Sequence, residues 1–319
     1  MQRPPIRRPQ TSIPMTLRAS VSPATISPSI QQFSGGYGYG FIGILVFSLT
    51  FPMTVVAVQE LSPALIALGR AWLAGIPACL ILWFYKIRRP KPAEWRGIGL
   101  ACIGIVIGWP LTSTIAMQTV SASHGAVVNG LLPLTTALCG AWYNNERLPR
   151  SFWMWAALGA AVVTGYALYA GNGALQLGDL WLVAAVVLGG IGYAGGGKAS
   201  RTLGGWQTTC WCLAISMPFL TLPTFYLTMN LPSWPPLSIL GAFAYLAFGS
   251  MFLGFFAWYK GLAMGGIARV GQLLLIQPFL TVVASAWLFG ERVPLATYLF
   301  ALAVIVIIGA SRYVTVNHS

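Results

Sequence analysis

Apolar residues occur along this chain in stretches of about 20, separated by short polar connections and preceded by a polar N-terminal segment. A stretch of this length crosses a lipid bilayer as an α-helix. The pattern therefore predicts an all-α polytopic membrane protein. Ten transmembrane helices are expected, at residues 37–58, 63–85, 95–118, 121–143, 151–170, 177–197, 205–228, 235–259, 266–289 and 294–314.

The composition supports this prediction. Hydrophobic residues make up 57% of the 319 positions and charged residues only 7%, with a mean hydropathy of +0.74. A soluble domain usually carries about 25% charged residues, because its surface faces water. Most of this surface is therefore expected to face lipid.

Residues 1–36 differ from the rest of the chain. They are rich in Pro, Ser, Thr and Arg and show no apolar periodicity. Because such a segment buries too little apolar surface to fold, we expect a disordered cytoplasmic leader. Residues 315–319, after the last span, are expected to form a cytoplasmic tail.

The Lys and Arg residues that give the chain its net charge of +13 cluster at particular ends of the spans. If the N-terminus is inside, sixteen of the 18 Lys and Arg residues fall in cytoplasmic segments. This bias is typical of membrane proteins, and basic residues do not line one face as nucleic-acid binding would require. Ten spans with both termini in the cytoplasm fit this distribution, and nucleic acid is not an expected partner.

A short charged motif occurs twice. AWYNNERLP occupies 141–149 and AWLFGERVP occupies 286–294, and seven of 17 positions are identical between 133–149 and 278–294. The two copies fall in the fourth and ninth spans, five spans apart. An odd separation places the copies on opposite sides of the membrane, so residues 37–170 and 177–314 are predicted to be inverted five-helix repeats.

Inverted repeats are typical of secondary transporters, whose substrate site lies near the bilayer midplane where the halves meet. The sequence therefore predicts a carrier that exports small neutral metabolites by alternating access. A different class stays open: a non-transporting integral membrane protein, such as a lipid-handling enzyme or a scaffold.

Other kinds of chemistry are disfavoured. The GxGxxG stretch at 190–195 lies inside a span without the strand that a dinucleotide fold needs, so its glycines are interpreted as points of close helix packing. The five cysteines lie in apolar spans, and the two histidines cannot form a metal site together. No cofactor, metal or catalytic activity is expected.

Several motifs occur in a characteristic order. The first repeat holds LSP at 61–63, RAW at 70–72, SAS at 121–123 and the run from Pro133 to Leu148, and the second repeats the run as QP…W…GER at 277–292. In this order and doubling the chain resembles EamA-type transporters of the drug/metabolite transporter superfamily. The resemblance covers about residues 37 to 314.

This resemblance implies a ten-helix, basket-like transporter with a central cavity in the bacterial inner membrane. Such proteins usually export metabolites, often amino acids. The chain is most similar to bacterial exporters of aromatic and neutral amino acids. A small-molecule substrate and the lipid bilayer are the implied partners; the oligomeric state is open, and a monomer is plausible.

A site for an amino acid needs donors for the carboxylate, acceptors for the ammonium and apolar walls. Helix breaks expose backbone groups for this purpose, and we expect hinges at Pro52 and Pro110 in the first and third spans. Trp109 is the strongest candidate, because it lies in the middle of a span beside a proline. The other candidate binding residues are Ser48, Thr112, Ser113, Asn129, Tyr193, Gln272 and Gln277, each of which could instead bond only between helices.

His124 and Arg269 occupy equivalent positions of the two repeats. They could attract a carboxylate at opposite mouths of the pathway, but extension toward the interface is the favoured interpretation. Arg70, within the second span, is expected to satisfy carbonyls at a helix end. Because the acidic residues fall at span ends or in loops, we expect a cavity without buried charge and transport without obligatory proton exchange.

Overall fold

A computed structural model describes residues 30–144, 150–170, 175–265, 270–290 and 292–316. All regular secondary structure in these ranges is helical. The elements are α1 (Ile30–Ser48), α2 (Thr50–Ala57), α3 (Pro63–Phe84), α4 (Pro92–Ala101), η1 (Cys102–Gly108), α5 (Trp109–Ala116), α6 (Ala122–Asn129), α7 (Leu132–Asn144), α8 (Arg150–Ala170), α9 (Leu177–Leu203), α10 (Gly205–Met229), α11 (Leu237–Ala244), η2 (Tyr245–Gly254), α12 (Phe255–Gly265), η3 (Gly271–Leu275), α14 (Gln277–Phe289) and α15 (Leu295–Val316).

Eight helices in the described ranges are long and apolar enough to cross a membrane. They correspond to the first eight predicted spans. Two shorter apolar helices, Leu273–Phe289 and Leu295–Ile307, correspond to the ninth and tenth. The expected disordered leader is wrong at its C-terminal end, because α1 begins at Ile30 and residues 30–36 are helical.

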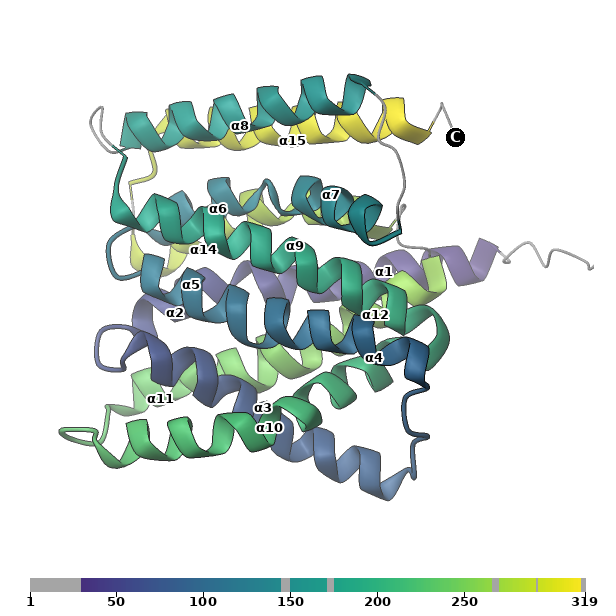
Figure 1. Cartoon of the computed structure of the whole chain (residues 1–319). Helices are drawn as coiled ribbons and strands as arrows, with labels where there is room; N and C mark the ends of the chain where they lie inside the picture. Colours follow the sequence, from purple (N-terminus) through teal and green to yellow (C-terminus); the bar gives the residue numbers. More distant parts are fainter. Residues whose placement is uncertain (1–29, 145–149, 171–174, 266–269, 291, 317–319) are drawn as a thin grey trace, which may run out of the picture.

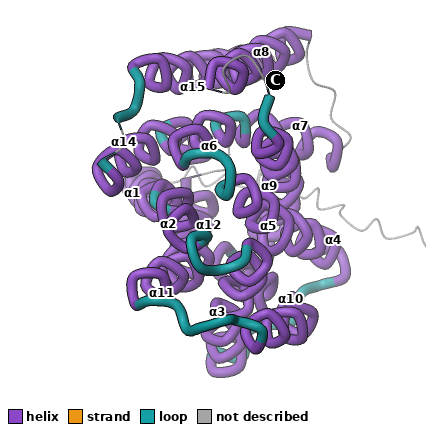
Figure 2. The backbone as a smooth tube through the Cα atoms, turned by 90° about the vertical axis from the view of Figure 1, so that its left-hand side faces the viewer, coloured by secondary structure: helices purple, strands orange, loops and turns teal. Residues whose placement is uncertain are grey.

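The helices lie side by side along one direction (Figure 1). Seen along that direction, α8 and α15 form one edge of the bundle, and α3, α10 and α11 form the opposite edge (Figure 2). The largest contacts join the halves of the chain: α1 packs on α12, α3 on α10, α4, α5 and α7 on α9, and α8 on α15. Exchanging the halves turns the α1–α12 pair into α9–α4 and leaves the α3–α10 and α8–α15 pairs in place, whereas the α7–α9 contact has no counterpart of similar size.

Glycine allows the closest of these approaches. A Cβ atom on Gly192 of α9 would lie 2.7 Å from the backbone nitrogen of Ile105, and one on Gly195 would lie 2.7 Å from the carbonyl oxygen of Gly97. Larger residues would separate α9 from α4 and η1. The glycines of the GxGxxG stretch therefore act in helix packing.

Three spans change their helical hydrogen-bonding pattern near their centres. The first changes from α1 to α2 at Leu49, three residues before Pro52, which has no N–H to donate to the carbonyl of Ser48. The third contains the π-helical turn η1 immediately before Trp109 and Pro110. The eighth contains the corresponding π-helical segment η2. Breaks at Pro52 and Pro110 were predicted from the sequence.

The fourth and ninth spans are also divided, which the sequence analysis did not predict. Helix α6 ends at Asn129 and α7 begins at Leu132, while η3 ends at Leu275 and α14 begins at Gln277. Pro133 and Pro278 lie in the first turn of the second piece, where a missing N–H is tolerated. These breaks place helix ends inside the bundle.

Candidate functional site: a closed polar cavity

The interrupted spans meet at an internal cavity. It is lined from both halves of the chain, by Phe47, Thr50, Arg70, Ile105, Trp109, Asn129, Leu132, Tyr193, Ser250, Phe255 and Gln277. The free space is about 20 Å³, on the order of one water molecule. The cavity is therefore closed, and a larger molecule requires its walls to separate.

Arg70 is the charged residue of this cavity. It lies in α3, its side chain is 2% exposed, and its Nε and Nη1 atoms have no hydrogen-bond partner among the described residues. The guanidinium carbon lies 5.6 Å from the centre of the Trp109 ring, within range of a cation–π interaction. No acidic residue is among the described residues that line the cavity.

This position overturns two expectations. Arg70 does not extend to a helix end, because it is buried beside Trp109. The cavity is also not free of buried charge. The signal was present in the sequence, since an ionisable residue inside a span is a functional candidate by default.

Trp109 is held on two sides. Its indole Nε1 donates a hydrogen bond of 3.1 Å to Oδ1 of Asn129, and its ring centre lies 5.6 Å from that of Phe51. Asn129 is the last residue of α6, so this bond joins the third span to the break in the fourth. Thr50 and Ser250 share a hydrogen bond of 2.8 Å across the same cavity and join α2 to η2.

The structure brings together four candidate binding residues: Trp109, Asn129, Tyr193 and Gln277. Gln277 is buried at the start of α14.

Three other candidates bond to nearby carbonyls and do not line the cavity. Ser48 donates to Leu45, Thr112 to Gly108 and Ser113 to Pro110. Gln272 lies in η3, and its side chain is outside the described part of the structure, as is all of Arg269.

The favoured interpretation of His124, extension toward the interface, is wrong. Its side chain is buried, and Nε2 lies 2.6 Å from Oδ1 of Asp179, which is also buried. Asp179 also accepts a hydrogen bond from the backbone N–H of Gln176 and so caps α9. The pair ties α6 of the first repeat to α9 of the second. Sequence reasoning missed it because the two residues are 55 positions apart.

His124 and the ring of Tyr166, whose centre is 5.1 Å from the imidazole centre, border a second pocket. This pocket has a volume of about 460 Å³ and lies where α6, α8 and α15 approach each other. Its lining is largely polar and includes Ser121, Ser123, Gln176 and Thr297.

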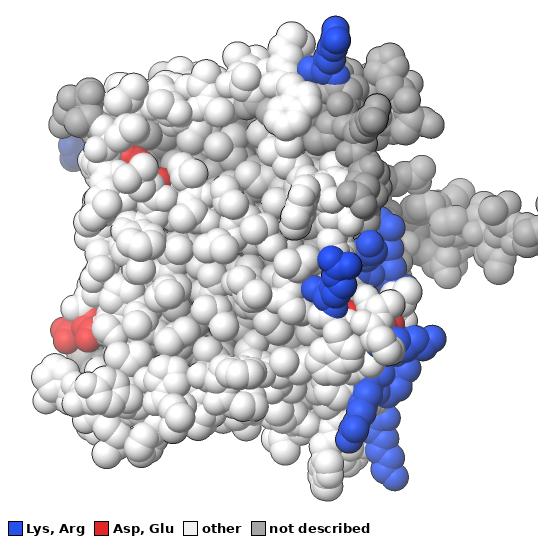
Figure 3. All heavy atoms as spheres, in the orientation of Figure 1, with Lys and Arg blue, Asp and Glu red and all other residues white. Residues whose placement is uncertain are grey.

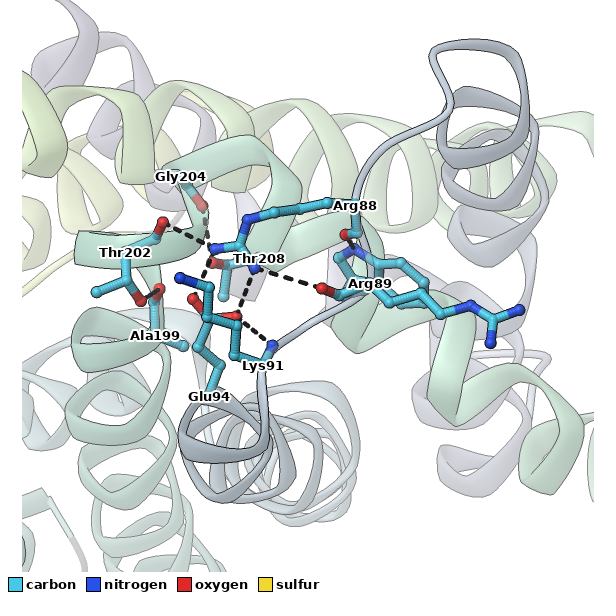
Figure 4. Close-up of polar contacts among 9 residues, drawn as sticks. Arg88, Arg89, Lys91, Glu94, Ala199, Thr202, Gly204 and Thr208 are labelled. Atoms are coloured by element: carbon cyan, nitrogen blue, oxygen red, sulfur yellow. Dashed lines mark hydrogen bonds and ion pairs between the residues drawn. The ribbon is translucent and has the colours of Figure 1, made fainter.

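The opposite end of α9 is also tied to the first repeat (Figure 4). Arg88 donates two hydrogen bonds to the carboxylate of Glu94, of 2.9 and 2.7 Å, and one of 3.0 Å to the carbonyl of Thr202. Glu94 also accepts the backbone N–H of Lys91. The bond to Glu94 raises the pKa of the Arg88 guanidinium above its ordinary value, which keeps it positively charged.

Apolar helices around a closed polar cavity, built from two halves, define a membrane protein of the transporter class. Residues 34–168 and 176–312 each match the EamA-like transporter family. The chain belongs to this family.

Two proteins of Bacillus subtilis strain 168 are similar to this chain, and both carry the name uncharacterized transporter. YdeK is 38% identical over 285 residues, which cover 89% of this chain and 99% of YdeK. YyaM is 22% identical over 281 residues, which cover 84% of this chain and 91% of YyaM. The crystal structure of one other protein shares the fold, with a TM-score of 0.60. The two chains are 19% identical, and the match covers 87% of this chain and 98% of the other.

Proposed function

We propose that this transporter exports small molecules that carry a carboxylate and a bulky apolar part, with aromatic and large neutral amino acids as the substrate class. The observation that carries the proposal is the buried guanidinium of Arg70 beside the Trp109 ring. Both residues line a cavity in which the described residues provide no counter-charge.

A buried cation without a partner is strongly unfavourable, so an anion that enters the cavity is stabilised there. Guanidinium binds carboxylate through two parallel hydrogen bonds, which fixes orientation as well as charge. Among the described residues, Nε and Nη1 of Arg70 have no hydrogen-bond partner. They lie on different edges of the guanidinium, so a carboxylate bound through two parallel hydrogen bonds would pair Nη2 with one of them. The substrate carboxylate is therefore assigned to Arg70.

The apolar part of the substrate is assigned to the aromatic wall. Phe47, Trp109, Tyr193 and Phe255 provide flat faces on which an aromatic or branched side chain packs. Asn129 and Gln277 offer neutral oxygen atoms to an ammonium group. Since these acceptors carry no charge, the carboxylate contributes more to recognition than the ammonium does.

Transport is proposed to occur by alternating access. The closed cavity has no room for an amino acid, so one end of the bundle must open at a time. Helix α9 has 27 residues and is about 40 Å long. In its first turn Asp179 contacts His124 of the first repeat. In its last turn the carbonyl of Thr202 accepts a hydrogen bond from Arg88, which is also bonded to Glu94 within the first repeat. We assign these two contacts, His124–Asp179 and Arg88–Thr202, as the two gates.

The basic end of the bundle is assigned to the cytoplasm. Lys and Arg gather at the end that carries Arg88 and Thr202, whereas acidic side chains are visible at the opposite end (Figure 3). Cytoplasmic segments carry the excess of basic residues. The Arg88–Thr202 contact is then the inner gate and His124–Asp179 the outer gate.

Three related compounds test the proposal in proteoliposomes that contain the purified chain. Phenylalanine has both charged groups, 3-phenylpropanoate has only the carboxylate, and phenethylamine has only the amine. We expect efflux of phenylalanine and measurable efflux of 3-phenylpropanoate, but none of phenethylamine. Efflux of the amine alone would contradict the role of Arg70, and no efflux of any member of a wider metabolite panel would favour the non-transporting alternative.

A further inference from the structure

A lateral groove opens on the surface of the bundle between the α1–α12 pair and the α3–α10 pair. Its volume is about 610 Å³. The lining residues are Tyr39, Ile42, Ile81, Tyr85, Trp206, Leu253, Phe256, Ala257 and Lys260. It shares none of the residues that line the central cavity.

The groove has an apolar floor and a polar end. Ile42 and Leu253 are more than half exposed, although each lies within an apolar span. Tyr85 follows the last residue of α3 and Trp206 is the second residue of α10, so both aromatic rings mark the end of a span. Tyrosine and tryptophan at such positions lie at the level of the lipid headgroups.

Lys260 is the cation of this end. Its Nζ atom donates a hydrogen bond of 2.8 Å to the hydroxyl of Tyr39 and lies 4.0 Å from the centre of the same ring. These contacts hold the ammonium group beside the apolar floor. No carboxylate is among the described residues that line the groove.

The surrounding surface adds positive charge. The basic side chains of Figure 3 gather at this end of the helices. Of the described carboxylates, Glu94 lies at this end, and it is already bonded to Arg88 and to the backbone of Lys91. The protein therefore provides little counter-charge here.

We propose that this groove binds an anionic phospholipid, with one acyl chain along the floor from Ile81 to Leu253 and the phosphate against Lys260. A basic pocket between transmembrane helices is chemically suited to an anionic headgroup. The exposed apolar floor gains contact with a chain that follows it, and the aromatic rim contacts the glycerol region. This assignment is independent of the transported substrate.

The test uses the purified full-length chain and native mass spectrometry with two probes that share their acyl chains, palmitoyl-oleoyl phosphatidylglycerol and palmitoyl-oleoyl phosphatidylcholine. We expect several-fold more retained phosphatidylglycerol than phosphatidylcholine. Lys260→Gln should abolish this preference, and Ala257→Trp, which fills the floor, should reduce retention of both lipids.

Lys198→Gln is the matched control, because Lys198 also lies over a tyrosine ring, that of Tyr143, at 4.1 Å. It does not line the groove, so the preference should be retained. An equal loss in Lys198→Gln and Lys260→Gln would show only general attraction to a basic surface and would overturn the site. Unchanged retention in Ala257→Trp, with a folded protein by gel filtration, would also overturn it.

Discussion

The imidazole of His124 and the carboxylate of Asp179, 2.6 Å apart, form a buried hydrogen-bonded pair between the first turns of two helices from different repeats. His124 lies in α6, an eight-residue helix whose last residue, Asn129, bonds to Trp109 in the central cavity. One short helix therefore connects this pair with the proposed substrate site.

Removing the charge of Asp179 is predicted to open the outer gate. Asp179→Asn keeps an oxygen that can accept from Gln176 but replaces the carboxylate that bonds His124, and loss of a hydrogen bond to a charged group costs about 1.5–3 kcal/mol. In a chain whose five native cysteines are replaced, Ser250→Cys should then react faster with an impermeant thiol reagent added outside. Glu60→Gln, which changes an exposed carboxylate, is the control; equal labelling of both variants would contradict the gate.

Changing Arg70 is predicted to alter recognition of the carboxylate. Arg70→Lys keeps the charge but loses the planar pair of donors, so phenylalanine efflux should fall by about tenfold or more, as expected from the loss of at least 1.4 kcal/mol from a charge-assisted hydrogen bond. Phenylalanine efflux by the Arg70→Gln variant should fall further, because the charge is lost as well. Wild-type efflux from Arg70→Gln in a folded protein would exclude the residue from the site.

The ring of Trp109 is predicted to select for size. Trp109→Ala removes the flat face and the hydrogen bond to Asn129, so transport of phenylalanine and leucine should decline much more than transport of alanine. Initial efflux rates for the three amino acids, normalised to reconstituted protein, measure this. An equal decline for all three would assign Trp109 to packing.

Transport is predicted to follow the gradient of the substrate without obligatory proton exchange. The described residues that line the cavity include no carboxylate or histidine that could exchange a proton there. An imposed pH gradient should therefore not drive accumulation of phenylalanine against its own gradient. Accumulation driven by the pH gradient alone that persists in His124→Ala would overturn this prediction.

The two repeats are predicted to be inverted in the membrane. Single cysteines at positions 172 and 291 should react with an impermeant reagent from outside, and one at position 147 only from inside. These positions lie outside the described residues, so labelling tests the topology directly. Labelling of positions 147 and 292 from the same side would contradict inversion.

Part of this architecture is determined by the sequence alone. The length of each apolar stretch defines the spans, and the doubled AWxxxERxP pattern defines the two halves, because hydrophobic length and repetition are properties of neighbouring residues. The breaks at Pro52 and Pro110 are equally local, since proline lacks the N–H that the preceding turn requires. Pro133 and Pro278 lie beside the breaks in the fourth and ninth spans, so a proline within the repeated segment also marked these two breaks in the sequence.

Only the tertiary structure decided which polar residues meet. Arg70 and Trp109 are 39 positions apart and His124 and Asp179 are 55 apart, and no periodicity in the chain relates either pair. A polar side chain near a span end can reach either water or a partner on another helix. Without a visible partner, the sequence favoured extension of His124 toward the water interface. Packing of α6 against α9 removes that choice, because it buries the imidazole where Asp179 supplies a hydrogen-bond partner in place of water.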